Sequence, residues 1–85
     1  MKISRPAITN NKKVRVDVLS SEKEKLVIVQ NLESKNVNVT VQLPGESFIL
    51  MDEQFSREKI NCNKIKSGVE FKLKLNPREV RVYRA

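Results

Sequence analysis

Hydrophobic and polar residues alternate along most of this chain. Valine occupies positions 14, 16 and 18, with Arg15 and Asp17 between them, and residues 37–43 and 69–75 alternate in the same way. Because successive side chains of a β-strand point to opposite faces, each segment is predicted to be a strand with one buried face. Residues 26–29 are apolar at every position, which predicts a strand that is covered on both faces or lies centrally in a sheet, and the central position is favoured.

Residues 79–84 also alternate and are predicted to be the last strand, whereas residues 47–52 and 60–65 have weaker strand patterns. Polar turns separate the strands, and Pro44-Gly45 suits a type II turn. Residues 52–59 are expected to form a loop or one helical turn, with Phe55 folded back over an open end of the core. About seven short strands without a helical stripe predict an all-β fold, an antiparallel β-sandwich, with a small β-barrel as the alternative.

The length and composition limit the chain to one domain. Eighty-five residues, 39% of them hydrophobic, support a single core built mainly of Val, Ile and Leu, since there is no Trp and only one Tyr. Residues 13–85 are predicted to form the sandwich, and residues 1–12 a loosely ordered lead-in. No segment reaches membrane-spanning length and residues 1–12 lack a signal-peptide core, so a cytoplasmic location without membrane contact is expected.

Few residue types for catalysis are available. His is absent and Cys62 is the only cysteine, which argues against zinc, haem and Cys–His chemistry and predicts neither a metal nor a cofactor. Cys62 is interpreted as a small buried side chain. The one acidic cluster, Asp52-Glu53 with Glu58, is interpreted as part of a solvated loop. The chain is therefore not expected to be an enzyme.

Positive charge is the one unusual feature of the composition. The formal net charge is +7, spread along the chain without a block of like charges. If the predicted strands at residues 14–18, 69–75 and 79–84 share a sheet, their outward residues would form one basic face. Tyr83 is the only residue of that face that could stack on a base. The favoured interpretation is that these side chains keep the sheet soluble. The candidate basic interaction face comprises Arg15, Lys72, Lys74, Arg78, Arg81, Tyr83 and Arg84.

Three runs of sequence carry a resemblance to a known group of domains. They are KLVIVQNL at 25–32, NVNVTVQLP at 36–44 and FKLKLNPREVRVYR at 71–84. Together they resemble the small C-terminal β-sandwich that follows the catalytic barrel in glycoside hydrolases of the α-amylase and α-galactosidase groups. The resemblance spans residues 13–85 and consists of strand alternation and a few turn residues. It implies a non-catalytic accessory module that caps or stabilises a catalytic chain.

The resemblance and the charge leave three functions open. The first is an accessory or stabilising module whose partner is the catalytic chain of a glycoside hydrolase. The second is a basic β-domain that binds nucleic acid, for which affinity would fall steeply with salt. The third is a structural protein that assembles with its own copies through a free sheet edge. The adjacent reading frame and a salt-titrated nucleic-acid assay distinguish the first two.

Overall fold

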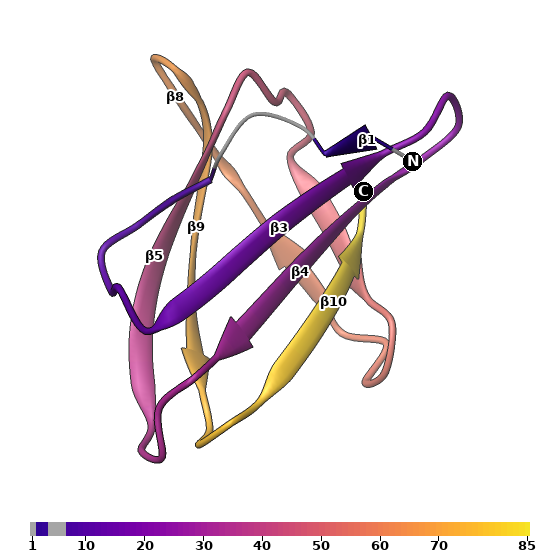
Figure 1. The fold of residues 1–85 in the computed structure, drawn as a ribbon. Helices are drawn as coiled ribbons and strands as arrows, with labels where there is room; N and C mark the ends of the chain where they lie inside the picture. Colours follow the sequence, from indigo (N-terminus) through magenta and orange to yellow (C-terminus); the bar gives the residue numbers. More distant parts are fainter. Residues whose placement is uncertain (1, 4–6) are drawn as a thin grey trace.

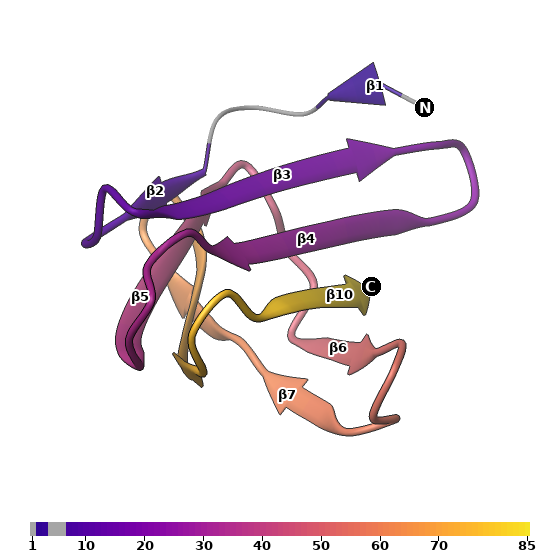
Figure 2. The same cartoon turned by 60° about the horizontal axis from the view of Figure 1, so that its bottom comes forward.

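The computed structural model describes residues 2–3 and 7–85, with the side chains of residues 7–85. These residues form two antiparallel sheets, seen from two sides in Figures 1 and 2. The six-stranded sheet runs in the order β1 (Lys2–Ile3), β3 (Val14–Ser20), β4 (Lys25–Asn31), β10 (Val80–Arg84), β6 (Leu50–Glu53) and β7 (Lys59–Asn61). The four-stranded sheet runs in the order β2 (Ile8–Thr9), β5 (Val37–Pro44), β9 (Gly68–Leu75) and β8 (Asn63–Ile65).

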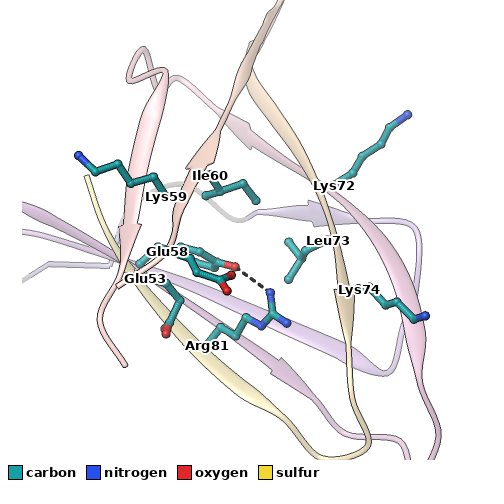
Figure 3. Close-up of a pocket in the computed structure, with 9 residues that line it drawn as sticks. Glu53, Glu58, Lys59, Ile60, Lys72, Leu73, Lys74 and Arg81 are labelled. Carbon is teal, nitrogen blue, oxygen red and sulfur yellow. Dashed lines mark hydrogen bonds between the residues drawn. The ribbon is translucent and has the colours of Figure 1, made fainter. Parts of the chain in front are cut away.

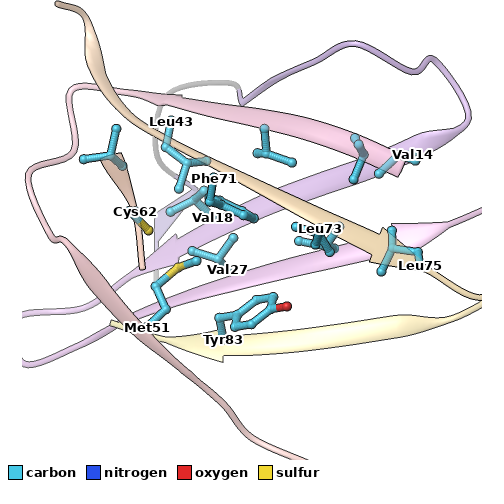
Figure 4. Close-up of a cluster of buried hydrophobic side chains, with 14 of the residues drawn as sticks. Val14, Val18, Val27, Leu43, Met51, Cys62, Phe71, Leu73, Leu75 and Tyr83 are labelled. Atoms are coloured by element: carbon cyan, nitrogen blue, oxygen red, sulfur yellow. The ribbon is translucent and has the colours of Figure 1, made fainter. Parts of the chain in front are cut away.

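The two sheets face each other across one apolar core, which confirms the predicted antiparallel sandwich. The alternating residues of β5 and β9 point inward from one sheet and meet the valines of β3 and β4 from the other (Figure 4). Side chains at the centre, including Val27, Val29, Val41 and Phe71, are at most 1% exposed. The pattern of period two therefore predicted the inward face of each long strand correctly.

Strand β4 is central, as predicted, but only one of its faces is covered. It pairs with β3 on one side and β10 on the other. Val27 and Val29 point into the core, whereas Leu26 and Ile28 lie on the outer face and are only half-buried. Of the two predicted alternatives, the structure thus confirms the central position, and no described element lies over the outer side of this strand.

The segment from Lys59 to Ile65 connects the two sheets. Residues 59–61 form β7 and pair with β6, whereas residues 63–65 form β8 and pair with β9. The change occurs at Cys62, whose side chain is buried as expected and whose N–H donates to the Ile49 carbonyl at 2.8 Å. The single strand predicted over 60–65 is therefore two strands in different sheets. The preceding strand, predicted from residue 47, begins at Leu50.

The type II turn predicted at Pro44-Gly45 is confirmed, whereas the segment 52–59 differs in part from its prediction. Gly45 has a φ of 81° and the Glu46 N–H donates to the Leu43 carbonyl at 3.4 Å, as a type II turn requires. Residues 54–56 form the turn between β6 and β7 without a helix. The prediction that Phe55 covers the core is wrong, because its side chain is 74% exposed.

The first dozen residues contribute two short strands. Residues 8–9 pair with 41–42 of β5, and residues 2–3 pair with 19–20 of β3. The expected loose lead-in at 1–12 therefore includes paired backbone at both places, and its residues 1 and 4–6 lie outside the described part of the chain. In that part, no helix is long and apolar enough to span a membrane.

Candidate functional site

The structure does not form the single basic face that the sequence suggested. The predicted face required β3, β9 and β10 to share a sheet, but β9 belongs to the other one. Lys72 and Lys74 are exposed on the outer face of the four-stranded sheet, and Arg15 and Arg84 on the outer face of the six-stranded sheet. The prediction of one continuous surface is wrong because β9 pairs with β5 in the four-stranded sheet, whereas β3 and β10 flank β4 in the other sheet.

Two members of the predicted face point into the sandwich. The register places Tyr83 beside Val27 and Arg81 beside Val29, both inward residues of β4. Tyr83 is only 2% exposed, and its ring lies edge to face against Phe71 at 6.1 Å between centroids. Tyr83 cannot stack a base or a sugar. The outward assignment of Arg81 and Tyr83 is wrong because the strand's apolar residues, Val80 and Val82, occupy the outer face instead.

The remaining member, Arg78, lies in the turn before β10. Its φ of 58° is in the left-handed region, and its N–H donates to the Glu33 carbonyl at 3.0 Å. This turn and the one before β5 are held together by Asn31, which is fully buried. The Asn31 amide donates to the carbonyls of Lys35 and Asn76 at 3.0 and 2.9 Å. Arg78 is thus a turn residue rather than part of a strand face.

Arg81 belongs to a small polar cluster on the inner side of β10. Its guanidinium contacts Glu79 at 3.1 Å. It also donates to the Tyr83 hydroxyl at 3.5 Å, the bond that is marked in Figure 3. Burial disfavours the charged guanidinium, but the hydrogen bonds to Tyr83 and Glu79 outweigh it and raise the pKa of Arg81. Burial also opposes ionisation of Glu79, yet bonds from Asn76 and Arg81 lower its pKa. Within the cluster, the positive charge of Arg81 is therefore balanced by the negative charge of Glu79.

Glu53 is the acidic residue whose environment differs most from the sequence-based prediction. It is 4% exposed, whereas Asp52 and Glu58 are exposed, so the solvated-loop interpretation is wrong for Glu53 alone. Its carboxylate accepts three backbone N–H groups, from residues 55 and 56 in the turn and from Val82 of β10, at 2.8–2.9 Å. Burial alone would raise the pKa of Glu53, but these bonds outweigh it and lower the pKa.

A cleft lies beside this cluster, between β7 and β9 (Figure 3). Its volume is about 270 Å³, below the range usual for small-molecule sites. The ammonium groups of Lys59, Lys72 and Lys74 point away from it, so their stems and backbone form its walls. Within the described residues no group of His, Cys, Asp and Glu side chains is arranged to hold a metal. Glu53, Glu58 and Arg81 also line the cleft, together with the apolar side chains of Ile60 and Leu73.

The outer faces of the two sheets differ in chemistry. The central outward positions of β5 and β9 are polar. The outer face of the six-stranded sheet instead carries apolar side chains at the centre, with the Arg15–Asp17 and Arg84–Glu24 ion pairs at its border. The register places Val82 beside Ile28, and Leu26 beside Leu19. This outer apolar strip consists of Leu19, Leu26, Ile28, Val80 and Val82.

The strip had a signal in the sequence. A strand that is apolar at every position indicates two covered faces, and in β4 the second face has no cover from the described chain. Its residues are half-buried by one another and by neighbouring strands, and Val80, at the border, is 42% exposed. An apolar centre with a charged border is the usual composition of a protein–protein interface.

Comparison with known proteins assigns no family to this arrangement. The geometry and the resemblance carried by residues 13–85 are therefore the basis for a function. No protein-family model matches the chain, and no curated protein is significantly similar to it.

Proposed function

We propose that this chain is a non-catalytic β-sandwich module that docks onto a partner protein through the outer apolar strip. The partner is the catalytic chain of a carbohydrate-active enzyme, as the resemblance to glycoside hydrolase accessory domains suggests. The observation that supports docking is the strip itself, with Ile28 and Val82 adjacent at its centre. Burying such a surface against a second apolar surface is favourable by about 25 cal/mol per Å².

The polar outer face of the other sheet supports the choice of surface. Thr40 and Gln42 of β5 are as half-buried as Ile28 of β4, yet they are polar, as expected for a face that meets water. The chain thus has one outer face suited to solvent and one suited to protein. The buried Tyr83 and the divided basic residues weaken the nucleic-acid alternative, because the predicted basic face has lost its stacking residue and is split between the two sheets.

Site-specific photo-crosslinking tests this proposal. A photoreactive amino acid placed at position 28 in cells of the native host should capture a protein that mass spectrometry identifies as a glycoside hydrolase catalytic chain. The same reporter at Thr40, on the central strand of the other sheet, is the matched control and should capture none. Capture only of a second copy would support self-assembly instead, and capture only of proteins without a glycosidase domain would exclude the proposed partner.

A substitution separates docking from folding. Ile28→Lys should abolish binding to the captured chain, because it places an ammonium at the centre of the apolar contact. Thr40→Lys should leave binding intact. Both variants should retain cooperative thermal unfolding, since both positions lie on outer faces of central strands. Equal binding by Ile28→Lys and wild type would exclude the strip as the docking surface.

A further inference from the structure

Part of the edge of β9 lacks a neighbouring strand in the described chain. On one side β9 pairs with β5 along its whole length, from Val37↔Leu75 to Pro44↔Gly68. On the other side β8 covers only residues 68–70. Residues 71–75 therefore have no strand beside them on the side that faces the cleft.

The hydrogen-bond pattern identifies which backbone groups point to that side. The Gly45 N–H donates to the Ser67 carbonyl at 2.8 Å, which fixes the bonded positions of the β5–β9 ladder at alternate residues. Thr40, opposite Lys72, makes its backbone bonds away from β9, to Asn10. The N–H and C=O groups of Lys72 and Lys74 therefore point away from β5, toward the cleft.

The cleft exists because β7 leaves β9 at Cys62. Extending the Asn63↔Glu70 register would place residues 61 and 59 opposite Lys72 and Lys74. Instead, residues 59–61 pair with β6, and the cleft separates Lys59 and Ile60 from β9. A short extended segment would occupy this space in line with β8 and satisfy about four backbone groups of β9.

We propose that this open edge binds an extended acidic segment of a partner chain as an added strand. The side chains of Lys72 and Lys74 are exposed on the outer face of the sheet. Carboxylates at the outward positions of the added strand would lie directly beside these two ammonium groups. The inward positions would face Ile60, Leu73 and Tyr83, which line the cleft, and favour apolar side chains. The segment thus alternates acidic and apolar residues.

The same lysines argue against a second copy of this chain as the occupant. Lysines along an edge hinder edge-to-edge pairing between identical molecules, because like charges are brought together. The net charge of +7 adds to that repulsion. Two acids line the cleft: Glu53 is engaged by backbone N–H groups, and Glu58 is exposed, so one carboxylate faces three lining lysines. An acidic strand is the partner that this edge accepts.

Fluorescence anisotropy with a labelled peptide of alternating Glu and Val, about seven residues long, tests the inference. The peptide should bind the wild-type chain, and the variant carrying Lys72→Glu and Lys74→Glu should bind about tenfold or more weakly. The matched control, carrying Lys12→Glu and Lys23→Glu, has the same net charge but should bind like wild type. If the first variant does not fold, the Gln substitutions at 72 and 74 replace it.

Backbone bonding distinguishes strand addition from charge attraction. A peptide of the same sequence with every backbone N–H methylated should bind at least about tenfold more weakly. Amide exchange followed by NMR should show that peptide binding slows exchange at Lys72 and Lys74. Equal binding of the methylated peptide, or equal losses in the two charge variants, would overturn the inference. So would a dimer that forms through this edge without peptide, or DNA that binds the same lysines more tightly than the peptide.

Discussion

Replacing Glu53 should destabilise the fold more than any other acidic substitution. Its carboxylate joins the β6–β7 turn to β10 by accepting N–H groups from Phe55, Ser56 and Val82. Glu53→Ala leaves all three donors without this acceptor. The Val82 N–H lies inside the sheet, so its loss costs about 1–3 kcal/mol, whereas water replaces the carboxylate at the exposed turn donors for about 0.5–1.5 kcal/mol each.

The expected change in the free energy of unfolding follows from these values. Removal of the Cγ methylene group of Glu53 adds about 0.8 kcal/mol, and relief of the carboxylate's desolvation offsets part of the total. The net loss is expected to be about 2–4 kcal/mol. For a domain of this size it lowers Tm by roughly 10–25 °C. Urea unfolding followed by the fluorescence of Tyr83, the only tyrosine, measures the free energy directly.

The pH dependence of the free energy of unfolding shows whether the ionised Glu53 carboxylate stabilises the fold. Because its folded-state pKa lies below the ordinary value of 4.5, its stabilisation is complete above that value and is lost as pH falls through the folded pKa. Glu53→Gln resembles the protonated side chain. The stability gap between wild type and Glu53→Gln should therefore be widest near neutral pH and should narrow as pH falls below about 4.5.

Glu58→Ala is the matched control, because Glu58 lies in the connection between β6 and β7, close to Glu53 in sequence, but is exposed. It should change stability by no more than about 0.5 kcal/mol. The reasoning would be refuted if Glu53→Ala and Glu58→Ala unfolded at the same urea concentration. A gap between wild type and Glu53→Gln that widened in acid would refute the proposed cause of the pKa shift.

Three further outcomes follow from the described contacts. Asn31→Ala should lower the free energy of unfolding by about 2–4 kcal/mol in urea titration, because a fully buried amide loses three hydrogen bonds. Gly68→Ala should cost about 1–3 kcal/mol in the same assay, since an added Cβ would lie 2.1 Å from the Leu43 carbonyl oxygen. In the free protein, the Lys72 amide should exchange with deuterium much faster than that of Leu73, which bonds to β5.

Alternation predicted the long strands because one buried face dominates their energetics. In β5 and β9 every second residue enters the core, so the phase is unambiguous. In β10 the same pattern gave the wrong phase, since Val80 and Val82 are apolar but face outward. Pairing with β4 decides the orientation, because Tyr83 must lie beside Val27. The orientation of β10 thus depends on a strand more than fifty positions away in the sequence. The sequence of β10 alone does not predict it.

The candidate surfaces were predictable to different degrees. The fully apolar run at 26–29 indicated a central strand or cover on both faces, and its Leu26 and Ile28 belong to the outer apolar strip. The crossing at Cys62 had no comparable signal, because residues 59–65 are extended throughout and only their partners change. Glu53 was also hidden, since its burial arises from three backbone donors rather than from a charged partner.

The crossing at Cys62 links the fold to both proposed contacts. It ties the two sheets along one side of the core, and in leaving β9 it opens the edge at Lys72 and Lys74. The outer apolar strip belongs to the other sheet and shares no residue with that edge. Binding at the two surfaces should therefore be separable: Ile28→Lys should spare the acidic peptide, and the charge reversal at 72 and 74 should spare docking through the strip. Loss of both contacts in either variant would mean that one surface serves both.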